Sequence, residues 1–144
     1  MLGDNCPVKK WRISSVGIAL AACVLAGCAA TPTSIADATR PGNPTGLDLD
    51  PLNNGPAVTW IQEGRTFAIV TCGSGSCPPV PTVLAPEGPD RITVTFAPSP
   101  NDPCTADMSP TTHEFELPEE VTGVPVTVEI AYEDWPETDS FILE

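Results

Sequence analysis

The stretch RITVTF, residues 91–96, alternates between apolar and hydroxyl-bearing side chains. Ile92, Val94 and Phe96 share one face of an extended chain, and the two threonines share the other. A period of two is typical of a β-strand that buries one face and leaves the other to solvent. The stretch therefore predicts a half-buried strand and decides the fold class of the domain around it.

Similar patterns lie on both sides of this stretch. Residues 126–132 repeat the alternation, and residues 58–62 and 66–72 flank the short connection Glu63-Gly64-Arg65, which suits a hairpin. Clusters of Pro, Gly and Asp separate the apolar segments and predict turns between them. The remaining predicted strands are residues 113–117 and 82–85.

Short strands with frequent turns over residues 57–133 favour an all-β fold. We expect a small antiparallel β-sandwich, immunoglobulin-like in the broad sense, with an open meander or a partial barrel as the alternative. Residues 66–72 are apolar or small on both faces, which predicts a central position in the sheet. A core of this size buries only about 60% of the surface of its unfolded chain, so a disulfide would add useful stability.

The N-terminus has the pattern of a secretory signal. Lys9, Lys10 and Arg12 precede an apolar run at residues 13–24, which is too short to cross a bilayer as a lone helix. The run ends in LAGC, residues 25–28, which resembles a bacterial lipobox. That resemblance implies cleavage before Cys28 and a diacylglyceryl group on its thiol; an ordinary secreted protein cut at a nearby site is the alternative.

These features predict a division of the chain into four parts. Residues 1–27 are the expected signal peptide, and residues 28–56 are the expected lipidated cysteine and flexible tether, because this segment is rich in Thr, Pro, Asn, Asp and Gly. Residues 57–133 form the β domain, and residues 134–144 form a C-terminal tail or a short final strand. Two or more acyl chains hold a protein stably on a membrane, so the predicted location is extracytoplasmic and lipid-anchored.

The charge of the chain excludes one large class of partner. The whole chain has 6 Lys and Arg against 19 Asp and Glu, and removal of residues 1–27 leaves 3 against 18, a net charge of −15 over 117 residues. Arg40, Arg65 and Arg91 are then the only strong cations, too few for a patch that tracks phosphates. We therefore expect no nucleic-acid binding, and we interpret the acidic surface as solubilising.

The residues that could carry chemistry form no recognisable catalytic or metal-binding pattern. A blue-copper site needs two histidines, and His113 is the only one. Cys72, Cys77, Cys104 and His113 supply ligand types for zinc, but the C-x4-C spacing is unusual and an exported chain favours thiol oxidation. The Gly-Ser-Gly-Ser run between the first two cysteines is not a G-x-S-x-G elbow. We expect no metal, no cofactor and no catalytic residue.

Cysteine arithmetic predicts one disulfide in the mature chain. With Cys28 lipidated, Cys72, Cys77 and Cys104 share one bond. Chain entropy favours closure onto Cys104 over the short Cys72–Cys77 loop by about 1.5 kcal/mol. Cys77 and Cys104 both lie in proline-rich loops, whereas Cys72 ends a strand beside small apolar residues, so a Cys77–Cys104 bond with a reduced, largely buried Cys72 is expected. A Cys72–Cys104 bond has nearly the same entropy and remains the competitor.

Three segments together resemble a group of small lipoproteins and secreted proteins of actinobacteria. They are GSGSCPPVP, PCTADMSPTTHEFELPE and GVPVTVEI, in this order. The resemblance implies an extracytoplasmic β domain with cysteines at the positions of Cys77 and Cys104. It implies no catalytic residue.

Two functions are compatible with these features. The first is a non-catalytic binding or scaffold module of the cell envelope, whose loops present a rigid surface to an envelope protein or ligand. The second is an inhibitor of an exported peptidase that uses the loop at 76–81, because Pro78, Pro79, Val80 and Pro81 form a stiff extended run. An enzyme of unknown type is the third and least favoured class.

Overall fold

The computed structural model describes residues 30–49 and 55–144. These residues form strands, turns and loops without a helix, so within them there is no helical segment able to span a bilayer. The strands are β1 (Ala38–Pro41), β2 (Ala57–Gln62), β3 (Thr66–Gly73), β4 (Val80–Pro86), β5 (Arg91–Ala97), β6 (Ser109–Glu116), β7 (Val126–Tyr132) and β8 (Trp135–Leu143).

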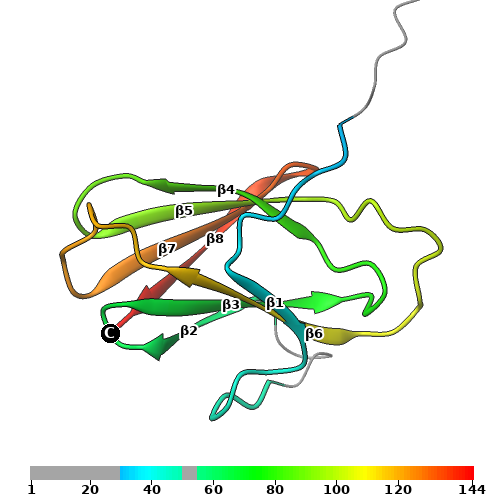
Figure 1. Cartoon of the computed structure of the whole chain (residues 1–144), viewed down its shortest axis with the longest axis horizontal. Coiled ribbons are helices and arrows are strands. Elements are labelled where there is room, and N and C mark those ends of the chain that lie inside the picture. The colour runs from blue at the N-terminus through cyan, green and yellow to red at the C-terminus, as the bar shows by residue number, and fades with distance from the viewer. Residues whose placement is uncertain (1–29, 50–54) are drawn as a thin grey trace, which may run out of the picture.

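The strands form two sheets that pack face to face (Figure 1). Sheet A has the order β1-β6-β3-β2, and sheet B has the order β4-β5-β7-β8. The predicted β-sandwich is confirmed, and the sheets do not close into a barrel or continue as a single meander. One strand pair differs from the antiparallel expectation, because β5 and β7 run parallel.

The hairpin predicted around Gly64 joins β2 to β3. Gly64 has φ 68°, a left-handed conformation that glycine adopts without the steric cost paid by other residues. β3 lies between β2 and β6, which confirms its predicted central position. Residues 67–71 of this strand are buried, since both faces of β3 are covered.

The core fills the space between the two sheets. Ile92, Val94 and Phe96 are fully buried, as their alternation predicts. Phe67 and Phe115, on neighbouring strands of sheet A, stack with ring centroids 5.3 Å apart. Burial of each large apolar side chain contributes roughly 2 kcal/mol, so the core supplies the main favourable term in folding. The core residues are Phe67, Ile69, Ile92, Val94, Phe96, Phe115, Val121, Val126, Val128, Ile130 and Leu143.

The structure departs from the predicted tether within residues 28–56. Ala38–Pro41 is β1, which pairs with β6 at the edge of sheet A. The segment has little apolar surface, but an edge strand of four residues needs only backbone hydrogen bonds to a neighbour. Beside the ladder between β1 and β6, two backbone bonds flank the strand, from Asp37 N–H to Glu114 O at 2.9 Å and from Gly42 N–H to Pro110 O at 2.8 Å. Tertiary pairing therefore overrides the composition of this segment.

The C-terminal residues form the longest strand of the domain. β8 pairs with β7 along its length, from Val126 opposite Leu143 to Tyr132 opposite Trp135. The indole N–H of Trp60 on β2 donates to the carbonyl of Glu144 at 3.0 Å, so the last residue ties β8 to the edge of sheet A. The prediction of a tail or short final strand over residues 134–144 therefore understated this element.

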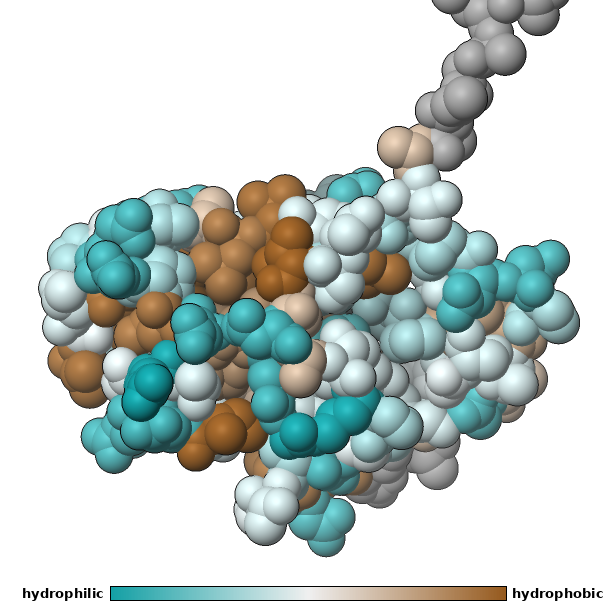
Figure 2. Space-filling view, in the orientation of Figure 1, coloured by the Kyte–Doolittle hydropathy of each residue, from teal (hydrophilic) through white to brown (hydrophobic). Residues whose placement is uncertain are grey.

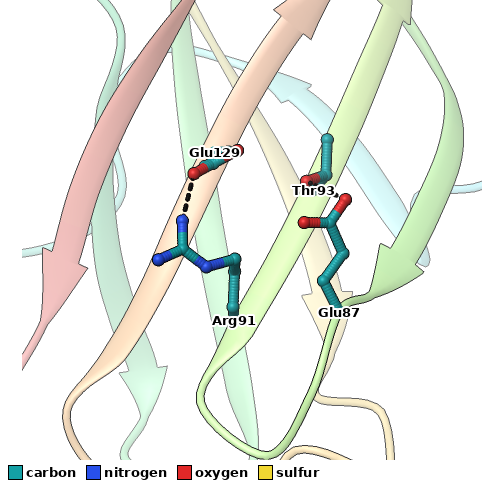
Figure 3. Close-up of polar contacts among 4 residues, drawn as sticks. All are labelled: Glu87, Arg91, Thr93 and Glu129. Carbon is teal, nitrogen blue, oxygen red and sulfur yellow. Dashed lines mark hydrogen bonds and ion pairs between the residues drawn. The ribbon is translucent and has the colours of Figure 1, made fainter.

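Polar side chains form a ladder on the outer face of sheet B (Figure 3). Arg91 on β5 forms an ion pair with Glu129 on β7, and the hydroxyl of Thr93 donates to Glu87 at 3.0 Å. These contacts are exposed, and exposed pairs contribute little to stability. Because Arg91 pairs with Glu129, its positive charge is already matched by a carboxylate within sheet B.

Candidate functional site

A disulfide fastens two loops at one end of the sandwich. Cys77 and Cys104 are bonded, with Cα atoms 5.4 Å apart, which is the predicted pairing. The loops that carry them lie side by side at the right of the view in Figure 1. Cys72 is free, and partial burial raises the pKa of its thiol. It is half-buried rather than largely buried, because β2 ends its pairing at the residue opposite Val70.

Hydrogen bonds around Ser76 join the same two loops. The backbone N–H of Thr105 donates to the Ser76 hydroxyl at 2.9 Å, and the side-chain amide of Asn101 donates to the Ser76 carbonyl at 2.8 Å. The turn itself is closed by a bond from Cys77 N–H to Ser74 O at 3.2 Å. The disulfide therefore acts together with several hydrogen bonds between the same two loops.

Asp107 is the acceptor at the centre of this cluster. Its carboxylate accepts hydrogen bonds from the hydroxyls of Ser109 and Thr105 and from the backbone N–H of Gly75. These bonds favour the charged form and lower the pKa of Asp107 to about 2. A Cβ on Gly75 would lie 2.8 Å from the Asp107 Oδ2 atom, so a side chain at this position would displace the carboxylate.

The contact between Gly75 and Asp107 was not predicted. The Gly-Ser-Gly-Ser run indicates a turn, and nothing in the local sequence identifies a carboxylate 32 residues away as its partner. A glycine between two serines and near a cysteine is only a weak signal of close packing. Its partner can be identified only after the disulfide has brought the two loops together.

A shallow cavity of about 180 Å³, here called the proline pocket, lies beside the fastened loops. The run at residues 78–81 forms one wall, and residues 99–101 form another. Thr39 of β1 and His113 of β6 also line it, and Ser34 contributes from the N-terminal segment. Among the described residues that line it, no side chain is a carboxylate, a lysine or an arginine. The lining residues are Ser34, Thr39, Pro78, Pro79, Val80, Pro81, Ser99, Pro100, Asn101 and His113.

The candidate binding run at residues 78–81 is held in the fold along its length. Pro78, Pro79 and Val80 are half-buried, and Pro81 is buried. β4 begins at Val80, so the second half of the run belongs to sheet B. The run therefore forms a fixed wall of the pocket instead of a loop that projects from the domain.

His113 lies behind the pocket and is fully buried. Its Nδ1 atom is 3.3 Å from the hydroxyl of Thr39, and its Nε2 atom is 3.2 Å from the hydroxyl of Thr71. The ring of Phe96, from the opposite sheet, packs against the imidazole in a T-shaped arrangement, with centroids 5.1 Å apart. Burial disfavours the imidazolium and lowers the pKa of His113 to about 4. The histidine therefore lies inside the core.

The histidine has the environment of a structural residue. A neutral imidazole has one N–H donor and one acceptor, and two threonine hydroxyls can satisfy both. Among the described residues, its side-chain hydrogen-bond partners are the hydroxyls of Thr39 and Thr71, and neither a carboxylate nor a thiol bonds to the ring. Within residues 30–49 and 55–144, no three His, Cys, Asp or Glu side chains lie close enough to hold a metal ion. The chemistry that the pocket offers is therefore apolar contact and hydrogen bonding.

Cys28, the predicted lipidation site, lies outside the described residues. The chain matches no model of a known protein family, no curated protein and no solved structure.

Proposed function

We propose that this chain is a lipid-anchored, extracytoplasmic binding module without catalytic activity, and that the proline pocket is its recognition surface. The observation that carries the proposal is the rigidity of the pocket. The disulfide and the hydrogen bonds of Asp107 join the two loops beside the pocket. The proline run that forms a wall of the pocket leads directly into strand β4. Binding to a surface that is already ordered costs little conformational entropy.

The size and lining of the pocket favour a protein partner. Small-molecule sites usually occupy roughly 300–1,000 Å³, whereas the proline pocket has about 180 Å³, enough for one side chain. Proline rings and Val80 provide apolar contact, and Ser99 and Asn101 provide hydrogen-bonding groups at the border. An apolar or aromatic side chain presented by an envelope protein fits this combination.

An extracytoplasmic location is consistent with the exposed position of the disulfide. Structural disulfides persist in oxidising compartments and are rare in the cytosol. Cys104 lies in an exposed loop, where a reducing environment would reach it. The signal-like N-terminus and the lipobox resemblance lead independently to the same compartment.

The lipid on Cys28 would hold the domain close to the bilayer. Within the part of the chain that the structure describes, Ile35 is the first residue whose backbone bonds to a strand, through its N–H to Pro81 O at 2.9 Å. Seven residue steps separate Cys28 from Ile35, and a fully extended chain of that length spans at most about 25 Å. Partners of the proline pocket are therefore expected in the layer next to the membrane.

Inhibition of a peptidase through residues 76–81 is the less favoured function. An inhibitory loop must project so that its backbone enters a substrate cleft. Here Pro81 is buried and Val80 begins β4, which leaves only the disulfide-bonded turn free to project. The burial of Pro81 and the start of β4 at Val80 instead favour a role for this run as a wall of the proline pocket.

Site-specific photo-crosslinking tests the proposed surface. A benzophenone amino acid replaces Pro79 in the full chain, expressed in a host that lipidates proteins and carries the natural envelope. We expect an ultraviolet-dependent adduct of discrete mass, and we expect Ser99→Phe, which fills the pocket, to abolish it. Thr138→Phe, on the exposed strand β8, is the matched control and should leave the adduct unchanged. An adduct that survives Ser99→Phe would overturn the assignment of the pocket.

A further inference from the structure

The N-terminal segment divides one edge of the sandwich into two parts. Residues 30–37, here called the strap, cross from sheet B to sheet A: Ile35 N–H donates to Pro81 O and Asp37 N–H donates to Glu114 O, both at 2.9 Å. In Figure 1 the strap passes in front of the two sheets between β4 and β6. On one side of the strap lies the proline pocket. On the other side of the strap no strand covers the end of β6, because β1 begins at Ala38 and pairs with β6 only as far as Glu114.

The open part forms a groove of about 460 Å³ between β4 and the end of β6. Its apolar lining comes from Ile35, Val83, Leu84 and Phe115. Ile35 is 42% exposed and Val83 is 48% exposed, which is high for aliphatic side chains. Figure 2 shows apolar surface gathered beside the strap, over the region of β4. We call this cavity the edge groove.

β4 has a free hydrogen-bonding edge along the groove. Glu87 N–H donates to Arg91 O, and Ala85 is opposite Thr93 in the same hairpin. Since alternate residues of an antiparallel strand bond to the same neighbour, the N–H and C=O of Leu84 point away from β5. β4 pairs with β5 alone, so these groups have no strand partner among the described residues.

Charge decides which kind of chain could use this edge. Asp37 and Glu116 border the groove, and no arginine lines it. Arg40 is paired with Glu114, and Arg91 is paired with Glu129. The chain has a net charge of −13, so a second copy would be repelled and a basic segment would be attracted.

We propose that an extended, basic peptide segment of a partner protein adds to β4 as a fifth strand of sheet B and places an apolar side chain in the edge groove. Strand addition gives affinity through backbone hydrogen bonds and specificity through alternate side chains. One face of the added strand would meet the groove and its acidic border, and the other would continue the outer face of sheet B. The proposal depends on neither the lipid on Cys28 nor the proline pocket.

The prolines at the ends of β4 limit the length of this pairing. The carbonyl of Pro81 is already bonded to the strap, and Pro86 has no N–H to offer. A bulge between Pro81 and Val83 adds a further irregularity. The free window is therefore residues 82–85, which admits a short peptide and prevents continued sheet growth.

Titration with a defined peptide tests the proposal. The probe is a fluorescent seven-residue peptide, Thr-Lys-Thr-Val-Thr-Lys-Thr with blocked termini, whose Val and two Lys side chains share one face of an extended strand; it is added to the purified full chain. We expect saturable binding, and we expect the Leu84 amide to exchange with solvent at least tenfold more slowly in the complex. Glu116→Lys should weaken binding by about tenfold or more, because it reverses a charge at the border of the groove.

Two controls separate strand addition from general attraction to an acidic protein. Glu137→Lys, on exposed β8 at the far edge of sheet B, makes the same change in net charge and should leave binding within about twofold. A peptide with the same side chains but N-methylated at alternate residues should not bind, since it cannot donate to β4. Equal weakening by both variants, undiminished binding of the methylated peptide, or an unprotected Leu84 amide in the complex would each overturn the proposal.

Discussion

The backbone N–H of Gly75 donates to the carboxylate of Asp107, 3.2 Å away and 32 residues later in the chain. The same carboxylate binds the hydroxyls of Thr105 and Ser109, so a single acidic side chain joins the turn before the disulfide to the loop after it. The proline pocket borders this cluster through Pro78 and Asn101. Its geometry therefore depends on contacts that are far apart in the sequence.

Gly75→Ala should destabilise the domain. The new Cβ would lie 2.8 Å from the Asp107 Oδ2 atom and 3.3 Å from the Ser109 Cβ atom, so the carboxylate must move and its hydrogen bonds to both loops weaken. We expect the melting temperature to fall by roughly 5 °C. Gly73→Ala is the matched control, because a Cβ there meets no heavy atom within 4 Å. Equal melting temperatures for the two variants would show that the close approach of Asp107 is unimportant.

The disulfide should contribute more to stability than the free cysteine does. A loop closed over a sequence separation of 27 residues corresponds to about 3.5 kcal/mol in the chain-entropy model. Cys77→Ser should therefore lower the free energy of unfolding by about that amount, whereas the half-buried Cys72→Ala should change it by less than about 1 kcal/mol. Denaturant unfolding measures both. Peptide mapping of the alkylated, unreduced protein must recover Cys77 linked to Cys104, and a crosslinked Cys72 peptide would contradict the assignment.

Stability should fall between pH 7.5 and pH 5 because of His113. Burial lowers the pKa of the folded imidazole to about 4, below the usual 6.5. The unfolded chain therefore binds a proton over this window and the folded chain does not, so the free energy of unfolding drops by about 2 kcal/mol as the pH falls. Asp107 contributes almost nothing here, because its ordinary pKa of 3.8 and its folded pKa of about 2 both lie below pH 5.

Two measurements check this dependence. His113 is the only histidine in the chain, so its imidazole gives a single set of proton resonances in a tag-free protein. These resonances should not titrate between pH 8 and pH 5.5, and a midpoint near 6.5 would contradict the burial argument. His113→Gln should show a flatter dependence of unfolding free energy on pH over the same window.

Strict alternation made the inner strands predictable. Residues 91–96 and 126–132 correspond to β5 and β7 almost to the residue, because each buries one face against the opposite sheet. Alternation carries no information on strand direction, which is why the parallel pairing of β5 and β7 was not predicted. The two-faced burial of residues 66–72 identified the central strand for the same physical reason.

The strands that were missed or shortened contain proline. β1 includes Pro41, β6 includes Pro110 and β8 includes Pro136, and a proline in a short segment argues against a strand. β1 and β8 are edge strands, where one side of the backbone needs no partner. β8 is also exposed over most of its length, so it lacks the apolar face that alternation detects.

The candidate site was predictable only in part. Loop entropy and the proline-rich surroundings identified the Cys77–Cys104 pair, and the proline run was identified as a stiff segment. The proline run becomes a wall of the pocket only together with Ser34, Thr39 and His113. These three residues lie in separate segments of the chain, and no sequence pattern links them to the run. A pocket that is assembled from distant strands has no local pattern.

The anchor on Cys28 is the part of the account on which its location depends, and one measurement tests it directly. The full chain is expressed in a lipoprotein-competent host with an alkyne analogue of palmitate and then partitioned between detergent and water. We predict a labelled protein in the detergent phase and an unlabelled Cys28→Ser variant that no longer partitions there. An unlabelled wild-type protein in the aqueous phase would contradict the claim that this domain is held at a membrane by lipid.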